Sequence, residues 1–424
     1  MRALSFSSSS SPLLRRRLRR ISKTSRRRAC SSARDAKNAS TPSSEKGRQK
    51  EDKKVFFAFG FGYCAIGIAN QLARLKKEEW TIVGTTRSDE KTEVLNLRSN
   101  GTWCKEVYTW KSDDGEPLDE KCESWLKIAD VVLISTPPNG DLDLDPILST
   151  KRVKEVLDGV EKRQMFIYLS STGVYGGHRG EWVDETTEPN PDSIVGQRRL
   201  NAEKAWTEWV LSEDNKKSTR SSLRIFRLGG IYGPGRSAID IAAKRKRERQ
   251  FQEKTSGKEE NVQSEGRNSI SNRDSDNNNI KNLLTPTQLS RRKKIFTSRI
   301  HVADIANSVI RCIEKEVEER EEEDTTNSNR RVVIYNVVDD YPSSRDEAVH
   351  FAANLLGYEN EDNIGNNKLN SKDTHPDRSE KRVKNGKLKR EVLSSSSSSL
   401  PSLLFPSFKE GLRAIRDGNQ IPFD

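Results

Sequence analysis

The sequence predicts an α/β protein with a doubly wound parallel sheet that helices cover on both faces. Short, wholly apolar runs recur along the chain, and patterns typical of helices separate them. Strands that are buried on both faces of a parallel sheet have this continuous apolar character. The expected strands are Thr81–Thr85, Val131–Ser135, Met165–Leu169, Leu223–Arg227 and Val332–Asn336. The expected helices are Thr92–Arg98, Pro146–Val160 and Leu200–Leu211.

The longest apolar stretch runs from Lys53 to Leu75 and predicts the first strand, a tight turn and a helix. Glycines interrupt this stretch, and it falls short of the ~20 clean apolar residues that a membrane span needs. A helical pattern that ends in Arg74 and Lys76 follows the glycines. We therefore expect no membrane partner.

The composition indicates that part of the chain is unstructured. Of the 424 residues, 32% are hydrophobic and 33% are charged, which is too few apolar side chains for a fully folded chain. The net charge is +12, but residues 1–54 alone hold 17 Lys and Arg against four Asp and Glu. The basic excess thus belongs to the N-terminal segment, so it does not indicate nucleic acid or an anionic membrane as a partner of the remainder.

Residues 1–50 are expected to be a transit peptide or a disordered basic arm. The first 34 residues contain no acidic side chain and are rich in Ser and Arg, which is typical of an organellar targeting segment. Because the serine block precedes the arginine block, we expect the chloroplast, with the mitochondrion as the alternative. The five cysteines and four histidines lack metal-ligand spacing, so the sequence indicates no metal site.

A glycine pattern follows the first expected strand. Gly60-Phe61-Gly62-Tyr63-Cys64-Ala65 stands between that strand and the next helix, where a G-x-G-x-x-G/A turn holds a dinucleotide in a Rossmann fold. Gly60 permits a tight turn, and Gly62 lets the backbone approach a pyrophosphate. Ala65 permits close packing of helix on strand, and the helix N-terminus attracts the phosphates. The alternative is a close-packed turn without a ligand.

The end of the second strand favours NADP over NAD. NAD-binding proteins usually place Asp or Glu here to hold the ribose 2′-hydroxyl, whereas this chain has Thr86-Arg87-Ser88. A guanidinium flanked by hydroxyls suits a 2′-phosphate. Thr136, after the strand at Val131–Ser135, is expected to contact the same cofactor. The alternatives are NAD as cofactor and Arg87 as a solvated loop cation.

These observations predict a folded core with polar interruptions. We expect a Rossmann domain at 54–243, completed at 295–358 together with a small C-terminal substrate lobe, and a C-terminal segment at 400–424. Residues 244–294 are expected to be a disordered insertion and residues 359–399 to be mostly disordered, because both are poor in large apolar side chains. The acidic run at 314–324 is expected to behave similarly.

Three further segments resemble the extended short-chain dehydrogenases, within the NAD-dependent epimerase/dehydratase superfamily. They are YLSSTGVYG at 168–176, RLGGIYGPGR at 227–236 and SRIHVADIA at 298–306. The resemblance covers roughly residues 54–345, apart from the insertion. It implies that Ser171, with Thr172 as the neighbouring alternative, orients a substrate, and that a Tyr-x-x-x-Lys pair follows to move the proton and hold the ribose.

The sequence departs from that pattern at its central pair. Val195 stands where the tyrosine is expected, and Arg199 where the lysine is expected. Valine has no proton to donate, while Arg199 retains the capacity to contact the cofactor ribose. Gly230 replaces the asparagine of many nucleotide-sugar enzymes, which disfavours a sugar-nucleotide substrate. The chain therefore resembles an atypical plastid and bacterial branch of the superfamily that lacks the Tyr-x-x-x-Lys pair.

His178 is a candidate replacement for the missing acid, since the pKa of histidine lies near neutrality. It follows the serine strand on a loop at the carboxyl end of the sheet, where ligands bind in this fold. A solvated loop histidine is the commoner situation. Tyr175 is expected to pack in the core instead.

Three functions remain open on the sequence alone. The first is an NADP(H)-dependent oxidoreductase or epimerase-like enzyme that acts on an unknown small substrate. The second is a catalytically inactive dinucleotide-binding scaffold or redox sensor. The third is a plastid RNA-binding relative, which is disfavoured because aromatic and basic residues do not interleave in the folded part. The sequence also leaves open whether the protein forms a homodimer.

Overall fold

The computed structural model describes most of the chain from residue 53 onward. The described ranges are 53–76, 78–112, 115–138, 145–212, 221–259, 294–322, 331–358, 380–394 and 403–423. The expected transit peptide and most of the expected insertion lie outside these residues.

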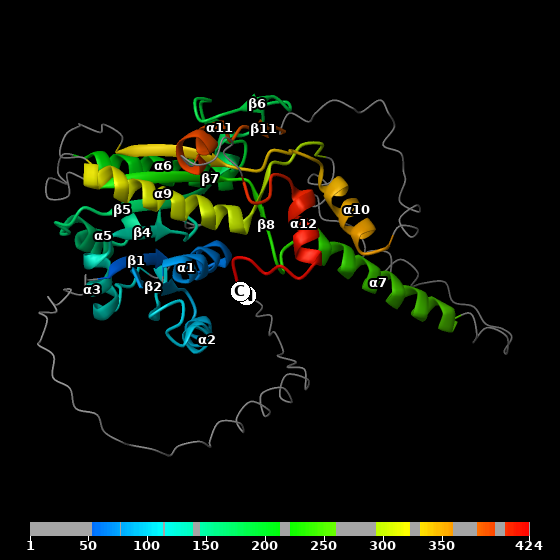
Figure 1. Ribbon diagram of the computed structural model, residues 1–424, viewed down its shortest axis with the longest axis horizontal. Coiled ribbons are helices and arrows are strands. Elements are labelled where there is room, and N and C mark those ends of the chain that lie inside the picture. Colours follow the sequence, from blue (N-terminus) through cyan, green and yellow to red (C-terminus); the bar gives the residue numbers. More distant parts are fainter. Residues whose placement is uncertain are drawn as a thin grey trace, which may run out of the picture. The chain divides into compact units, whose positions relative to one another are not determined.

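A seven-stranded parallel sheet forms the centre of the molecule (Figure 1), in the order β10-β7-β5-β4-β1-β2-β3. The strands are β1 Lys54–Phe59, β2 Trp80–Thr86, β3 Glu106–Thr109, β4 Val131–Ile134, β5 Met165–Ser171, β7 Ser222–Leu228 and β10 Val332–Val337. The predicted parallel sheet is thus confirmed, and each strand expected from its apolar run lies within it. The short edge strand β3 was not predicted. From β1 the chain adds β2 and β3 on one side of the sheet and then returns to add β4 on the other side. The carboxyl ends of β1 and β4 therefore border a crevice.

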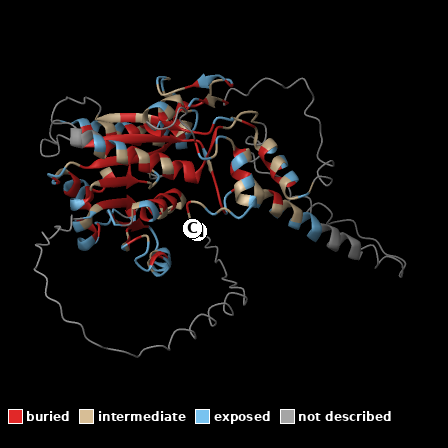
Figure 2. Ribbon diagram, viewed as in Figure 1, coloured by how far each residue is buried: buried red, intermediate tan, exposed pale blue. Residues whose placement is uncertain are grey.

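Helices cover both faces of the sheet, and each face has its own core (Figure 2). One face packs on α1 (Tyr63–Lys76), α2 (Asp89–Ser99) and α9 (Val302–Glu322). The other face packs on α3 (Glu120–Ile128), α4 (Pro146–Ser149), α5 (Lys151–Asp158) and α6 (Ile194–Leu211). The rings of Phe166, Trp206 and Trp209 meet on this second face with centroids 5.0–5.6 Å apart, which fixes α6 against β5.

Three helices form a small lobe beside the sheet: α7 (Ala238–Glu259), α10 (Arg345–Leu355) and α12 (Phe408–Arg416). Two short strand pairs connect distant parts of the chain. They are β6 (Trp182–Val183) with β11 (Arg382–Val383), and β8 (Gly230–Tyr232) with β9 (Arg299–His301). The lobe matches the expected position of a C-terminal lobe. In the described part of the chain, no helix is long and apolar enough to cross a membrane.

Two segments that were expected to be disordered are helical. Helix α7 continues to Glu259, so the expected insertion does not begin at residue 244. Helix α9 continues to Glu322 through most of the acidic run. Lys, Arg, Glu and Gln favour helices, and each segment extends a helix whose first turns are anchored by apolar contacts. The prediction of disorder rested on the shortage of apolar side chains in the two segments. It did not consider that each segment could continue a helix that begins in the core.

Part of the segment at 359–399, which was expected to be mostly disordered, has regular structure. Residues 380–394 contain β11, the short helix α11 (Gly386–Leu388) and a π-helical turn at Lys389–Leu393. Leu388, Val392 and Leu393 are buried in the core beside α9. A few well-spaced apolar residues therefore anchor a segment whose average composition is polar.

A buried polar cluster lies where the C-terminal segment joins the sheet. The Asp304 carboxylate accepts hydrogen bonds from the backbone N–H groups of Leu404 (2.6 Å) and Phe405 (3.1 Å). Asp339 lies nearby, with its Oδ2 atom buried and without a hydrogen-bond partner among the described residues. Burial raises the pKa of the Asp339 carboxyl to about 8.

Asp339 is expected to make stability depend on pH. In the unfolded chain its pKa is near 3.8, so from about pH 4 to 8 the folded protein holds a proton that the unfolded chain has released. The contribution of Asp339 to stability is thus largest at low pH and is lost as the pH rises towards 8. The difference in unfolding free energy between the parent and Asp339→Asn should fall with a slope of up to about 1.4 kcal/mol per pH unit.

Urea denaturation at several pH values measures this difference. The same substitution at the exposed Asp346 provides the control. A parent-minus-variant difference that stays constant from pH 5 to 8 would contradict the assigned protonation of Asp339.

Candidate functional site

The turn after β1 is held tightly against the neighbouring strands. Gly60 has φ +85°, and a Cβ atom there would lie 2.8 Å from the Thr136 hydroxyl oxygen. The Gly60 N–H donates to the Thr85 hydroxyl oxygen at 3.1 Å, and the Phe61 N–H donates to the Thr85 carbonyl at 2.7 Å. Only glycine adopts this backbone conformation readily. Gly60 therefore permits the tight turn after β1.

Gly62 leaves open space in front of the first turn of α1. Among the described residues, a Cβ atom added at Gly62 would have only the Ser135 hydroxyl oxygen within 4 Å, at 3.8 Å. Helix α1 begins at Tyr63, so the N–H groups of Tyr63, Cys64 and Ala65 have no acceptor within the helix. These donors and the helix dipole together favour an anion in front of the loop.

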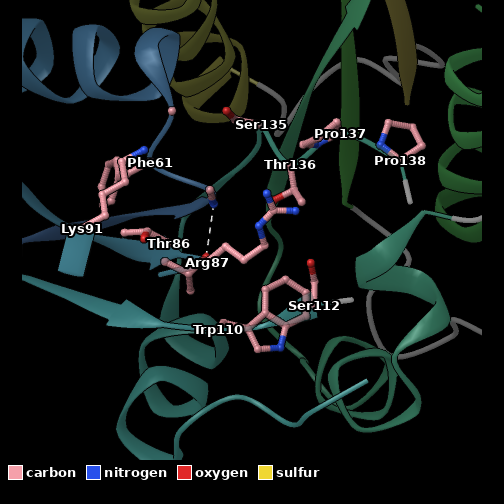
Figure 3. A pocket seen from close by; sticks show the side chains of 13 residues that line it. Phe61, Thr86, Arg87, Lys91, Trp110, Ser112, Ser135, Thr136, Pro137 and Pro138 are labelled. Atoms are coloured by element: carbon pink, nitrogen blue, oxygen red, sulfur yellow. Dashed lines mark hydrogen bonds between the residues drawn. The ribbon is translucent and has the colours of Figure 1, made fainter. Parts of the chain in front are cut away.

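A cavity of about 290 Å³ opens at this position (Figure 3), where the carboxyl ends of β1, β2 and β4 meet. Its lining residues are Gly60, Phe61, Gly62, Thr85, Thr86, Arg87, Lys91, Trp110, Ser112, Ser135, Thr136, Pro137 and Pro138. We call it the glycine-loop cavity. It lies in the crevice beside β1 and β4, which is the position where open α/β sheets bind their ligands.

The glycine-loop cavity carries positive charge. Arg87 and Lys91 both line it, and no Asp or Glu is among the lining residues that the structure describes. The Arg87 side chain extends into the cavity (Figure 3). Burial lowers the pKa of Lys91 from its usual value. The described lining therefore suits an anionic ligand, and within it no carboxylate is placed to hold a ribose 2′-hydroxyl.

Of the residues expected to hold a cofactor, six line the glycine-loop cavity and five do not. Those that line it are Gly60, Phe61, Gly62, Thr86, Arg87 and Thr136; those that do not are Tyr63, Cys64, Ala65, Ser88 and Arg199. Ser88 instead caps α2, since its hydroxyl accepts the Lys91 N–H at 3.2 Å. Cys64 and Ala65 are buried under the loop.

Sequence reasoning missed Lys91, Trp110 and Ser112 as lining residues. Trp110 and Ser112 follow β3, which carries too short an apolar run to be predicted as a strand. Lys91 lies in the first turn of α2, three residues after the Ser88 cap. Phe61 contributes to the cavity only at its edge, because its ring is 1% exposed and packs edge-on against Trp103.

The serine segment ends β5 and begins a 3₁₀ turn at Thr172–Tyr175. The Ser171 hydroxyl accepts the Gly173 N–H at 3.1 Å. Ser171 and Thr172 are both half-buried, and neither lines the glycine-loop cavity. The first turn of α6 lies against this turn, since a Cβ atom at Gly196 would be 2.8 Å from the Gly173 carbonyl oxygen.

The structure places Val195 beside the serine turn, where the family pattern has tyrosine. Its side chain is 68% exposed, so an apolar group occupies the surface at this point. Arg199 is not among the residues that line the cavity; it donates to the Leu169 carbonyl at 2.7 Å, with its guanidinium over the Tyr168 ring. Neither side chain can perform the proton transfer that a Tyr-x-x-x-Lys pair performs.

Hydrogen bonds hold His178 within its loop. Its Nε2 atom lies 3.0 Å from the Tyr175 carbonyl oxygen, and its backbone N–H donates to the Glu380 carbonyl at 2.8 Å. Lys381, directly before β11, contacts this loop and donates to the Gly176 carbonyl at 2.7 Å. Burial lowers the pKa of Lys381 to about 8. Sequence reasoning missed Lys381 because it assigned that segment to disorder.

A buried ion pair between Glu203 and Arg227 contacts β5 next to Ser171. Glu203 on α6 accepts Arg227 Nη2 at 2.7 Å and the Ser170 hydroxyl at 2.5 Å. The Arg227 guanidinium also stacks on the Tyr175 ring, 4.8 Å from its centroid. Tyr175 is fully buried, as expected, and donates to Asn336 at 2.9 Å. Among the described residues, no group of three or more His, Cys, Asp or Glu is placed to hold a metal ion.

Solved structures share this fold along the length of the chain. A functionally unknown conserved protein from Silicibacter pomeroyi DSS is 26% identical, with 87% of this chain and 100% of that chain covered and a TM-score of 0.52. A putative epimerase from Burkholderia cenocepacia J2315 is 16% identical (88% and 99% covered, TM-score 0.53). A dTDP-glucose 4,6-dehydratase from Bacillus anthracis, solved in complex with NAD, is 12% identical (88% and 100% covered, TM-score 0.52). No family model and no curated protein matches the chain.

The sheet order and the glycine turn after β1 define a Rossmann-fold protein. The chain shares this fold with the putative epimerase and the dTDP-glucose 4,6-dehydratase. The resemblance seen in the three sequence segments is therefore confirmed at the level of the fold.

Proposed function

We propose that the protein binds NADP(H) in the glycine-loop cavity. The observation that carries this proposal is the pairing of a bare glycine turn with two cations, Arg87 and Lys91, in a cavity whose described lining residues include no carboxylate. Gly62 and the first turn of α1 would hold the diphosphate. Arg87 and Lys91 would hold the ribose 2′-phosphate. NADPH supplies a hydride when bound.

Titrations of the full chain with NADPH and NADH test the cofactor assignment. We expect NADPH to bind at least about tenfold more tightly, which corresponds to about 1.4 kcal/mol. Arg87→Asp should reverse this preference, because a carboxylate repels the 2′-phosphate and accepts from the 2′-hydroxyl of NADH.

The matched control is Lys151→Asp, the same charge reversal at an exposed position on α5. It should leave the ratio of NADPH to NADH affinity unchanged. Equal affinities for the two cofactors in the parent, or an Arg87→Asp variant that keeps the parent's ratio, would rule out the assignment.

We further propose that the protein is an oxidoreductase or epimerase-like enzyme on a small carbonyl or hydroxyl compound. Ser171 ends a strand at the carboxyl edge of the sheet, beside the exposed first turn of α6, where its hydroxyl would orient a substrate. NADPH oxidation across a panel of carbonyl compounds tests this step. Ser171→Ala should lower the turnover number and leave NADPH affinity unchanged.

A second candidate function is a dinucleotide-holding scaffold without chemistry. The exposed Val195 favours it, because no proton donor stands at the usual position. This function predicts tight NADPH binding without oxidation of NADPH by any compound of the same panel. The two candidates therefore differ in turnover and agree in affinity.

A further inference from the structure

A second cavity lies between α1 and α2, behind the glycine loop. Its volume is about 560 Å³, which falls within the range of small-molecule sites. Ile66 on α1 and Leu95 on α2 contribute apolar surface to its lining. None of its lining residues also lines the glycine-loop cavity, so the two cavities can be tested separately.

Among the described residues, the lining of the second cavity contains two arginines and no acid. Arg74 comes from the end of α1, and Arg98 comes from the last turn of α2. Arg74 donates through one guanidinium nitrogen to Gln71 at 2.8 Å, which leaves it further N–H donors. A guanidinium presents paired donors that match a carboxylate. Two such groups beside apolar walls favour an organic anion over an inorganic one.

The walls of this cavity include two aromatic side chains that the rest of the fold holds in place. The Trp103 ring lies edge-on to Phe61, with ring centroids 5.7 Å apart. The Phe423 ring lies against Tyr63 at 5.0 Å. Phe61 and Tyr63 flank Gly62 in the glycine loop. Both walls are thus positioned by buried or half-buried neighbours, and flat rings of this kind pack well against an aromatic ligand.

We infer that the cavity between α1 and α2 binds a small aromatic carboxylate. The carboxylate would pair with Arg74 and Arg98, and the ring would lie on the apolar surface between Trp103 and Phe423. This site is independent of the proposed dinucleotide site, because it uses other side chains and its ligand is assayed without NADP(H).

Calorimetric titration of the full chain with 1-naphthoate, in the absence of dinucleotide, tests the inference. The uncharged 1-naphthamide has nearly the same shape and serves as the matched ligand. We expect one naphthoate to bind per chain and the amide to bind at least about tenfold more weakly. Arg74→Gln and Arg98→Gln should each weaken naphthoate binding by about tenfold, since each removes a charged hydrogen-bond donor.

Two control variants locate the ligand. Arg413→Gln makes the same change at an exposed arginine on α12 and should leave naphthoate affinity unchanged. Arg87→Gln changes the glycine-loop cavity and should also leave it unchanged. The inference is overturned if naphthoate fails to bind, if the amide binds equally well, if neither Arg74→Gln nor Arg98→Gln weakens binding, or if Arg87→Gln weakens it as much as they do.

Discussion

Replacing Glu203 with alanine is expected to lower the free energy of unfolding by about 3–5 kcal/mol. The Glu203 and Arg227 side chains are only 4% and 3% exposed. Removing the carboxylate leaves the Arg227 guanidinium buried without its counter-ion and the Ser170 hydroxyl without its acceptor. Such uncompensated buried groups cost far more than the intact pair contributes. Chemical denaturation monitored by tryptophan fluorescence measures the loss.

Two further variants separate charge burial from the loss of helix packing. Glu208→Ala changes an exposed glutamate on the same helix and should alter stability by less than about 0.5 kcal/mol. The double variant Glu203→Leu/Arg227→Met replaces the pair with apolar groups and should recover most of the loss. A Glu203→Ala protein as stable as Glu208→Ala would contradict the role assigned to the pair.

Gly60→Ala is expected to remove dinucleotide binding and to destabilise the fold. A left-handed backbone costs a non-glycine residue about 1–2 kcal/mol. The new Cβ atom would also lie 2.8 Å from the Thr136 hydroxyl oxygen and 3.3 Å from the Thr136 backbone nitrogen. Because the loop must shift to relieve this contact, the phosphate-facing N–H groups move with it. NADPH affinity, measured by titration, should fall by at least about tenfold, or about 1.4 kcal/mol.

Gly115→Ala is the matched control for this substitution. Gly115 has φ +68°, and no atom of the described residues lies within 4 Å of a Cβ atom built there. It therefore shares the backbone strain of Gly60→Ala without the steric contact, and it lies outside the glycine-loop cavity. Equal NADPH affinities for the two variants would show that the contact with Thr136 does not shape the loop.

The sequence was sufficient for the central sheet and for the glycine turn. Both depend on patterns of residues that are close together in the sequence. Wholly apolar runs are typical of buried parallel strands. A G-x-G-x-x-A turn between strand and helix is typical of a phosphate-facing loop. Strand β3 escaped prediction because it is a four-residue edge strand that contains Glu106 and lacks a continuous apolar run.

The site was predictable only where its residues adjoin a recognised pattern. Arg87 and Thr136 follow two of the expected strands, and both line the cavity. Arg199 was placed by alignment with a family position; it lies outside the lining of this cavity and bonds to the Leu169 carbonyl, so its contact with a cofactor stays a prediction. Lys381 reaches the serine loop from about 200 residues further along the chain. No local pattern specifies such a contact, because it depends on tertiary packing.

The C-terminal residues have a consequence for how the protein is made. Pro422 and Phe423 rest on α1 at Gly67, and Asp304 secures the backbone at Leu404 and Phe405. Helix α1 leaves the ribosome long before Pro422 and Phe423, because most of the sheet and its other helices lie between them in the sequence. The nascent chain therefore lacks the cover over α1 at Gly67 until these two residues have been made. Molecular chaperones that recognise apolar surface would meet the chain at this part of α1.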